Sequence, residues 1–170
     1  MRVQTPVGRL PASVIIAGNV LFWPTWTVLV GYAAQRTPAE RFSRDNWLTR
    51  PRPYEDDGVW YRDTLQIDRW KSRLPEAGSA FGGFAKRTVS GGNPVVMKRF
   101  VVETRRAEHA HWVMVSGAAV TLLWNPWWAA PANLAFAAGG NLPCIAVQRY
   151  NRVRLGRALA AVRRRATSSR

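Results

Sequence analysis

Cysteine is nearly absent from this sequence of 170 residues, in which Cys144 stands alone. A lone cysteine cannot close an intramolecular disulfide, and two histidines do not add up to a Cys/His cluster that binds structural zinc. Acidic residues are also scarce, since ten Asp and Glu oppose 25 Lys and Arg, a formal net charge of +15. Disulfide scaffolds and zinc fingers are therefore excluded. A nucleic-acid binder, a secreted cationic protein or a membrane protein with basic aqueous parts remains, built as one domain.

Charge of either sign is missing from residues 10–35, a stretch of 26 residues. At a helical rise of about 1.5 Å per residue, its apolar centre covers a hydrocarbon layer of about 30 Å. The stretch therefore predicts a transmembrane helix. Arg2 and Arg9 precede it and also fit a cleaved signal peptide, but the apolar part exceeds a usual signal core of about 7–15 residues, which favours a retained anchor.

A second uncharged stretch covers residues 109–148, 40 residues that would make a helix about 60 Å long, twice a bilayer core. Asn125 and Pro126 interrupt it, flanked by three tryptophans that suit a membrane interface. We therefore expect a transmembrane hairpin with arms 109–125 and 126–148. Two buried helices of a soluble core are the alternative, but so many uncharged residues are hard to fit inside a chain of this size.

Together these spans predict an all-α integral membrane protein with about three transmembrane helices, one N-terminal and two in a C-terminal hairpin. Two basic residues precede the first span, 15 lie within residues 36–108, and eight arginines without an acid follow in residues 149–170. The positive-inside rule then makes the polar middle segment a small cytoplasmic interfacial cap and makes the basic tail cytoplasmic. The tail favours anionic lipid head groups over nucleic acid, because it has no aromatic stacking platform apart from Tyr150.

Within the middle segment, residues 59–73 predict a short amphipathic helix at the membrane interface. The apolar side of this helix would consist of Trp60, Tyr61, Ile67 and Trp70. Residues 74–87 are rich in glycine and match neither a Walker loop nor a dinucleotide fingerprint. They suggest a flexible interfacial turn, with Lys86 and Arg87 as a weak signal for an anionic group such as phosphate.

Before the hairpin, Thr104, Glu108 and His111 are spaced i, i+4 and i+7 and form one polar stripe on a helix. A carboxylate three residues before a histidine can accept its Nδ1–H and leave Nε2 free to take a proton from a hydroxyl. We therefore expect His111 to be a general base that Glu108 orients, with Glu103 as a second carboxylate. His109 points to another face and has no evident partner. Alternatively, the charges only mark where the helix leaves the membrane.

Residues 103–112 (ETRRAEHAHW), followed about thirty residues later by residues 141–155 (NLPCIAVQRYNRVRL), resemble the glycosyl-4,4'-diaponeurosporenoate acyltransferase family. Enzymes of that family complete the carotenoid staphyloxanthin in bacterial membranes by esterifying a fatty acid onto the C6 hydroxyl of glucose. The residues that match the first motif are Glu103, Arg106, Glu108, His111 and Trp112. Those that match the second are Asn141, Pro143, Gln148, Arg149, Tyr150, Asn151, Arg152 and Arg154. The resemblance extends loosely to Trp70 and Lys71, while Val153 stands where the family usually has proline.

The resemblance implies a multi-pass acyltransferase of the bacterial cytoplasmic membrane that moves a fatty acyl group onto a sugar hydroxyl of a glycosylated carotenoid or related glycolipid. It implies no cofactor and no metal, an activated donor such as acyl-CoA or acyl carrier protein as co-substrate, and membrane lipids as further partners. The catalytic residues would be His111, Glu108 and Glu103, and the substrate-binding residues Arg106, Asn141, Arg149, Tyr150, Asn151 and Arg152. No serine or cysteine nucleophile motif is present, so no covalent acyl-enzyme is expected. The alternative is a non-catalytic membrane subunit for lipid binding or assembly.

Overall fold

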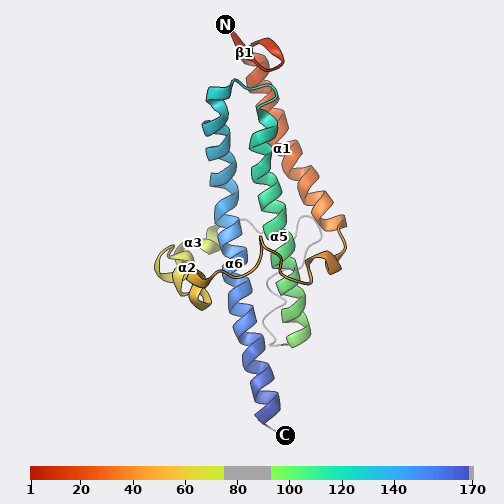
Figure 1. Cartoon of the computed structure of the whole chain (residues 1–170), viewed down its shortest axis with the longest axis vertical. Helices are drawn as coiled ribbons and strands as arrows, with labels where there is room; N and C mark the ends of the chain where they lie inside the picture. The colour runs from red at the N-terminus through yellow and green to blue at the C-terminus, as the bar shows by residue number, and fades with distance from the viewer. Residues whose placement is uncertain (75–92, 169–170) are drawn as a thin grey trace.

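The computed structural model describes residues 1–74 and 93–168, and helices dominate it (Figure 1). Its long elements are α1 (Ala12–Arg36), α5 (Pro94–Thr121) and α6 (Ala130–Ser168). The short helices are η1 (Ala39–Phe42), η2 (Pro53–Gly58), α2 (Val59–Asp63), α3 (Ile67–Trp70), η3 (Lys71–Arg73) and η5 (Trp127–Ala129). The predicted helical architecture is confirmed, and the all-α prediction missed only the N-terminal β-hairpin among the described residues, where β1 (Arg2–Thr5) and β2 (Gly8–Pro11) pair antiparallel. Gly8, with φ of 116°, allows the tight turn between these strands.

Helix α1 follows directly on this β-hairpin and coincides with the first predicted span. It is the one helix of the described residues that is long and apolar enough to cross a membrane. Large apolar side chains such as Ile16 and Leu21, 62% and 70% exposed, point away from the rest of the protein. Pro24 interrupts the backbone hydrogen bonds of α1 without ending it, which neighbouring packing tolerates in apolar helices.

Helices α5 and α6 form the predicted hairpin, and residues 122–129 between them contain the expected turn at Asn125 and Pro126. Asn93 caps the start of α5 by accepting a hydrogen bond from the backbone N–H of Val95 (2.9 Å), and Pro94 occupies the first helical position, where it costs no hydrogen bond. Both helices extend well past the uncharged stretch. The end of the polar middle segment and the basic tail are thus continuous with the apolar hairpin.

The predicted helix over residues 59–73 is wrong, because the chain breaks there into α2, α3 and η3. Gln66, the residue before α3, adopts a left-handed conformation with φ of 49°, which separates α3 from α2. The break lets Tyr61 and Ile67, both almost fully buried, pack against Val147 and Tyr150 of α6. In a single helix Tyr61 and Ile67, six residues apart, would point about 120° away from each other. The separate short helices instead bring both against α6 and cover its middle from one side (Figure 1).

Aromatic side chains of α1 pack on α5 at Gly117, a residue without a side chain. The indole Nε1 of Trp26 donates to the carbonyl oxygen of Val113 (3.2 Å) beside Gly117. Nearer the hairpin turn, Asn19 and Asn125 exchange two amide hydrogen bonds of 2.9 Å, and the indole of Trp124 donates to Asn19 (3.0 Å). Polar groups in an apolar setting are costly unless paired, so these bonds fix the register of α1 on the hairpin.

Replacing Gly117 by valine should weaken the packing of α1. A Cβ at this position would lie 2.6 and 2.7 Å from two atoms of the Trp26 indole, closer than side chains approach. Overpacking of this kind costs about 1–3 kcal/mol. Thermal unfolding in detergent measures the loss. Gly139→Val in α6 is the matched control, because a Cβ there meets nothing within 4 Å, and equal unfolding temperatures for the two variants would contradict the packing.

Candidate functional site

The most buried charge of the described chain is the Glu108 carboxylate, which lies between α5 and α6 with no exposed surface. Its Oε1 accepts from Nη1 of Arg149 and its Oε2 from Nη2 of Arg152, each at 2.6 Å. The predicted hydrogen bond from Glu108 to His111 is therefore wrong. Helical spacing brings the two side chains to one stripe, but two arginines of α6 lie closer to the carboxylate and neutralise it.

Besides Glu108, Arg149 binds the loop before α2. Its Nε donates to Oε1 of Glu55 (2.7 Å), and its Nη1 and Nη2 donate to the carbonyl oxygens of Leu48 (2.9 Å) and Arg50 (3.0 Å). Burial disfavours its charge, but the two carboxylates outweigh burial and raise the pKa of Arg149. Every nitrogen of this guanidinium thus has a hydrogen-bond partner within the protein.

Glu55 is a second buried carboxylate, for which the sequence predicted no role. Besides Arg149, it accepts from the hydroxyl of Tyr61 and from the backbone N–H of Arg52 (2.6 Å). Burial, together with the neighbouring carboxylate, raises the pKa of the Tyr61 phenol, so this hydroxyl remains a donor at neutral pH. The local sequence of residues 53–58 shows an acidic residue close to prolines. It does not indicate that this residue pairs with Arg149, 94 residues later.

His111 pairs across the hairpin with Asn141 of α6, through a hydrogen bond of 2.8 Å between Nδ1 and Oδ1. The amide nitrogen of Asn141 donates to the carbonyl oxygen of Ala137 (2.8 Å), so Oδ1 is the atom that faces the ring. An amide oxygen only accepts, and Nδ1 of His111 must therefore carry the proton. Within residues 1–74 and 93–168, the other ring nitrogen, Nε2, has no hydrogen-bond partner.

Glu103 lies away from His111 and forms an ion pair with Arg106 one turn along the same helix (3.0 Å). Arg106 also donates to the side chain of Gln35 and the backbone of Thr37, and so ties the end of α1 to α5. The predicted support of His111 by Glu103 is thus wrong. Arg106 is buried and joins two helices, although its Nε lacks a partner in the described structure.

His109 has two partners where none was expected. Its Nδ1 faces the carbonyl oxygen of Arg105 (2.8 Å), which fixes the proton on Nδ1, and its Nε2 accepts from the amide of Asn46 (2.9 Å). Both ring nitrogens are therefore engaged. Helical geometry showed that His109 faces away from His111, but Asn46 lies in a loop 63 residues earlier.

Tyr150 and Asn151, both predicted to bind substrate, differ in their surroundings. Tyr150 is buried, and its hydroxyl donates to the carboxylate of Asp68 at 3.2 Å. Asn151 is partly exposed on α6, and its side chain has no hydrogen bond within the described part of the chain. Of this pair, Asn151 alone retains free polar atoms.

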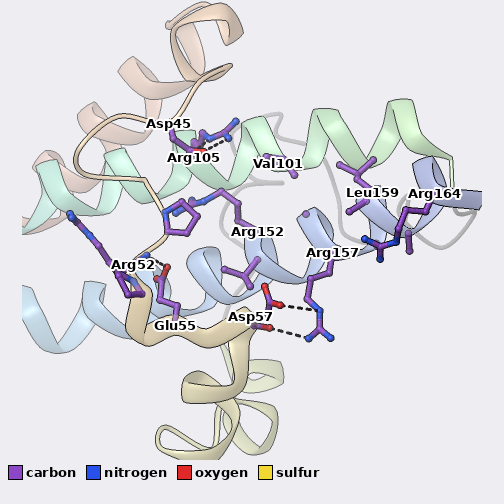
Figure 2. Close-up of a pocket in the computed structure, with 17 residues that line it drawn as sticks. Asp45, Arg52, Glu55, Asp57, Val101, Arg105, Arg152, Arg157, Leu159 and Arg164 are labelled. Atoms are coloured by element: carbon purple, nitrogen blue, oxygen red, sulfur yellow. Dashed lines mark hydrogen bonds and ion pairs between the residues drawn. The ribbon is translucent and has the colours of Figure 1, made fainter. Parts of the chain in front are cut away.

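Two hollows lie near these residues. The arginine-lined cavity, of about 1090 Å³, is bounded by the loop before α2, by α5 and by the second half of α6 (Figure 2). Its charged lining residues are Asp45, Arg52, Glu55, Asp57, Arg105, Arg152, Arg157 and Arg164. An apolar groove of about 590 Å³ lies between α1 and α5, from Trp26 to Phe42. Among the residues that can be placed, no three His, Cys, Asp or Glu side chains come together as a metal site.

The hairpin thus joins the two motifs of the sequence, through Glu108 with Arg149 and Arg152 and through His111 with Asn141. The family model of glycosyl-4,4'-diaponeurosporenoate acyltransferases matches residues 43–161, which contain all of these contacts. The chain belongs to this family of acyltransferases.

Two relatives carry the family's name as their own. The glycosyl-4,4'-diaponeurosporenoate acyltransferase of Staphylococcus haemolyticus (strain JCSC1435) is 27% identical over 135 residues, which cover 79% of this chain and 78% of that protein. The enzyme of the same name from Staphylococcus aureus (strain bovine RF122 / ET3-1) is 24% identical over 148 residues, 85% of this chain and 88% of the relative. No solved structure matches the chain.

Glu108→Gln should destabilise the protein strongly, because it leaves two buried guanidinium groups without their shared carboxylate. Breaking one member of a buried ion pair costs about 3–5 kcal/mol. Denaturant or thermal unfolding in detergent measures this cost. Asp63→Asn is the control, since its pair with Arg62 is exposed and should contribute less than about 1 kcal/mol. If both variants have the same unfolding midpoint as the wild type, the buried network has no structural role.

Proposed function

We propose that this protein transfers a fatty acyl group from an activated donor to a sugar hydroxyl of a glycosylated carotenoid or related glycolipid, with His111 as general base. Nε2 of His111 takes the proton of the acceptor hydroxyl while the hydroxyl oxygen attacks the acyl carbonyl carbon. The tetrahedral intermediate then collapses, the bond to the carrier breaks, and the imidazolium returns its proton to the leaving group. The cycle needs no covalent acyl-enzyme.

The observation that carries this proposal is the His111–Asn141 hydrogen bond. It fixes the Nδ1–H tautomer and directs the lone pair of Nε2 away from its own orienting partner. An asparagine oxygen orients a catalytic histidine as a carboxylate does, without adding a charge. Asn141 therefore takes the orienting role that the sequence suggested for Glu108, and Glu108 becomes a residue that positions the two helices.

The location of His111 suits a reaction at a membrane surface. Exposed apolar side chains gather around the turn end of the bundle, including Leu123, Trp127 and Phe136, whereas the buried ion pairs lie toward the other end. His111 lies three residues from Glu108, on the side of the turn. In the arrangement that we propose, all three long helices enter the bilayer at the turn end, and the middle segment and the C-terminal part of α6 are cytoplasmic.

Replacing His111 by alanine should abolish acylation and leave the fold intact, because the buried ion pairs do not involve its side chain. Comparative lipid mass spectrometry of cells that make the wild type, His111→Ala or no protein measures this directly. A glycolipid that gains one fatty-acyl mass only with the wild type is the expected product. His109→Gln is the control and should retain acylation, as both nitrogens of His109 are already hydrogen-bonded.

The same experiment separates the enzyme from a non-catalytic lipid-binding subunit. An unchanged lipid profile in the native organism after loss of the protein would contradict the acyltransferase, and full activity of His111→Ala would contradict the base.

Asn141→Leu should lower kcat by about 10²-fold or more with little change in KM, since the ring loses the acceptor that sets its tautomer. Asn141→Asp keeps an acceptor oxygen at the same place and should recover most of the lost rate. Steady-state kinetics with the purified protein in detergent distinguish the two. Equal rates for the leucine and aspartate variants would show that Asn141 only packs the hairpin.

A further inference from the structure

We propose that the acyl donor carries phosphate and that the arginine-lined cavity binds its phosphate groups, with Arg152, Arg157 and Arg164 as the ligands. The inference rests on the proposed function and adds the chemical class of the donor. Because five arginines and three carboxylates line the cavity, its charge is positive before any other residue is counted. Figure 2 shows these arginines around one hollow.

Arg152 gives the main argument for an anion-binding role of the cavity. Its side chain is 5% exposed, and Nη2 donates to Glu108 and to the carbonyl oxygen of Thr49. Its Nε and Nη1 are buried without a hydrogen-bond partner in the described structure. Buried guanidinium donors without acceptors are costly, and an anion that enters the cavity beside them would supply the acceptors.

The carboxylates that line the cavity supply few of the acceptors that these arginines need. Asp45 is held by Arg105 at 2.7 Å, and although burial opposes its charge, that arginine lowers the pKa of Asp45. Glu55 is already neutralised by Arg149, which lies outside the cavity lining. Asp57 lies 4.0 Å from Arg157 in an exposed and therefore weak pair.

Arg164 completes the set, since it lines the cavity and forms no ion pair within the residues that the structure describes. Arg152, Arg157 and Arg164 follow one another at spacings of five and seven residues along α6, and guanidinium groups can bind several oxygens of a phosphate or diphosphate. Apolar side chains, among them Val101, Val153 and Leu159, line the rest of the hollow and suit an uncharged part of the same ligand. A volume of about 1090 Å³ is sufficient for a nucleotide-sized molecule.

The cavity also lies at a suitable distance from the proposed base. Val101 and Arg105 line it from α5, ten and six residues before His111, which corresponds to about 15 and 9 Å along the helix. A donor whose phosphates bind at the arginines therefore needs a flexible arm to bring its acyl carbonyl to Nε2 of His111. Thioesters of coenzyme A and membrane phospholipids both combine phosphate with an acyl group on such an arm.

Titration calorimetry of the purified protein in uncharged detergent tests the proposal, with coenzyme A as the first ligand and short-chain phosphatidylglycerol as the second. The variant Arg157→Gln/Arg164→Gln removes two exposed arginines of the cavity without touching the Glu108 network. We expect it to weaken binding of the preferred ligand by roughly tenfold or more. The control Arg62→Gln/Arg69→Gln removes the same charge from α2 and α3 and should bind as the wild type does.

The ligand that loses affinity identifies the source of the phosphate: coenzyme A indicates a soluble thioester donor, and phosphatidylglycerol indicates a phospholipid donor. Equal affinity of the cavity variant and the control for both ligands would overturn the proposal. His111→Ala, which lacks the base but keeps the cavity, should bind the ligand with wild-type affinity. The binding result is therefore independent of acylation. If the acylation test fails, the calorimetry still shows whether the cavity binds phosphate.

Discussion

The contact on which the structure most depends is the shared carboxylate of Glu108, placed between two arginines of the facing helix. It joins α5 to α6, and through Arg149 and Arg152 it also holds the backbone of residues 48–50 against the hairpin. Such a cluster is stable only when each charge has its partners, because the attraction between the buried ions must offset the free energy of hydration that they lose. Residues 48–50 therefore have a fixed position, although they belong to no long helix.

The sequence was most informative where one physical property acts over a long stretch. Absence of charge revealed α1, and Asn125 with Pro126 revealed the turn of the hairpin, since both signals are local. It was least informative about which side chains contact one another. Helical spacing identified Glu108 and His111 as neighbours on one face, yet Arg149 and Asn141 are nearer to them in space. Glu55 and Asn46 were missed because a contact across 94 or 63 residues leaves no trace in local pattern.

The same limit explains the two errors in secondary structure. Residues 59–73 have an amphipathic composition, but burial of Tyr61 and Ile67 against α6 outweighs the weak preference of a short isolated helix. Each strand of the N-terminal β-hairpin has only four residues, the lower limit at which alternation of apolar and polar residues is recognisable. In each case tertiary contacts or a tight turn, rather than intrinsic propensity, determine the backbone.

Order of synthesis gives the buried ion pairs a further meaning. Glu108 leaves the ribosome 41 residues before Arg149, so for a time α5 exists without the charges that compensate its carboxylate. A lone carboxylate is too costly to dehydrate, and α5 must keep that turn in water until the second arm has been made. Burial of the Glu108 carboxylate therefore follows the synthesis of α6.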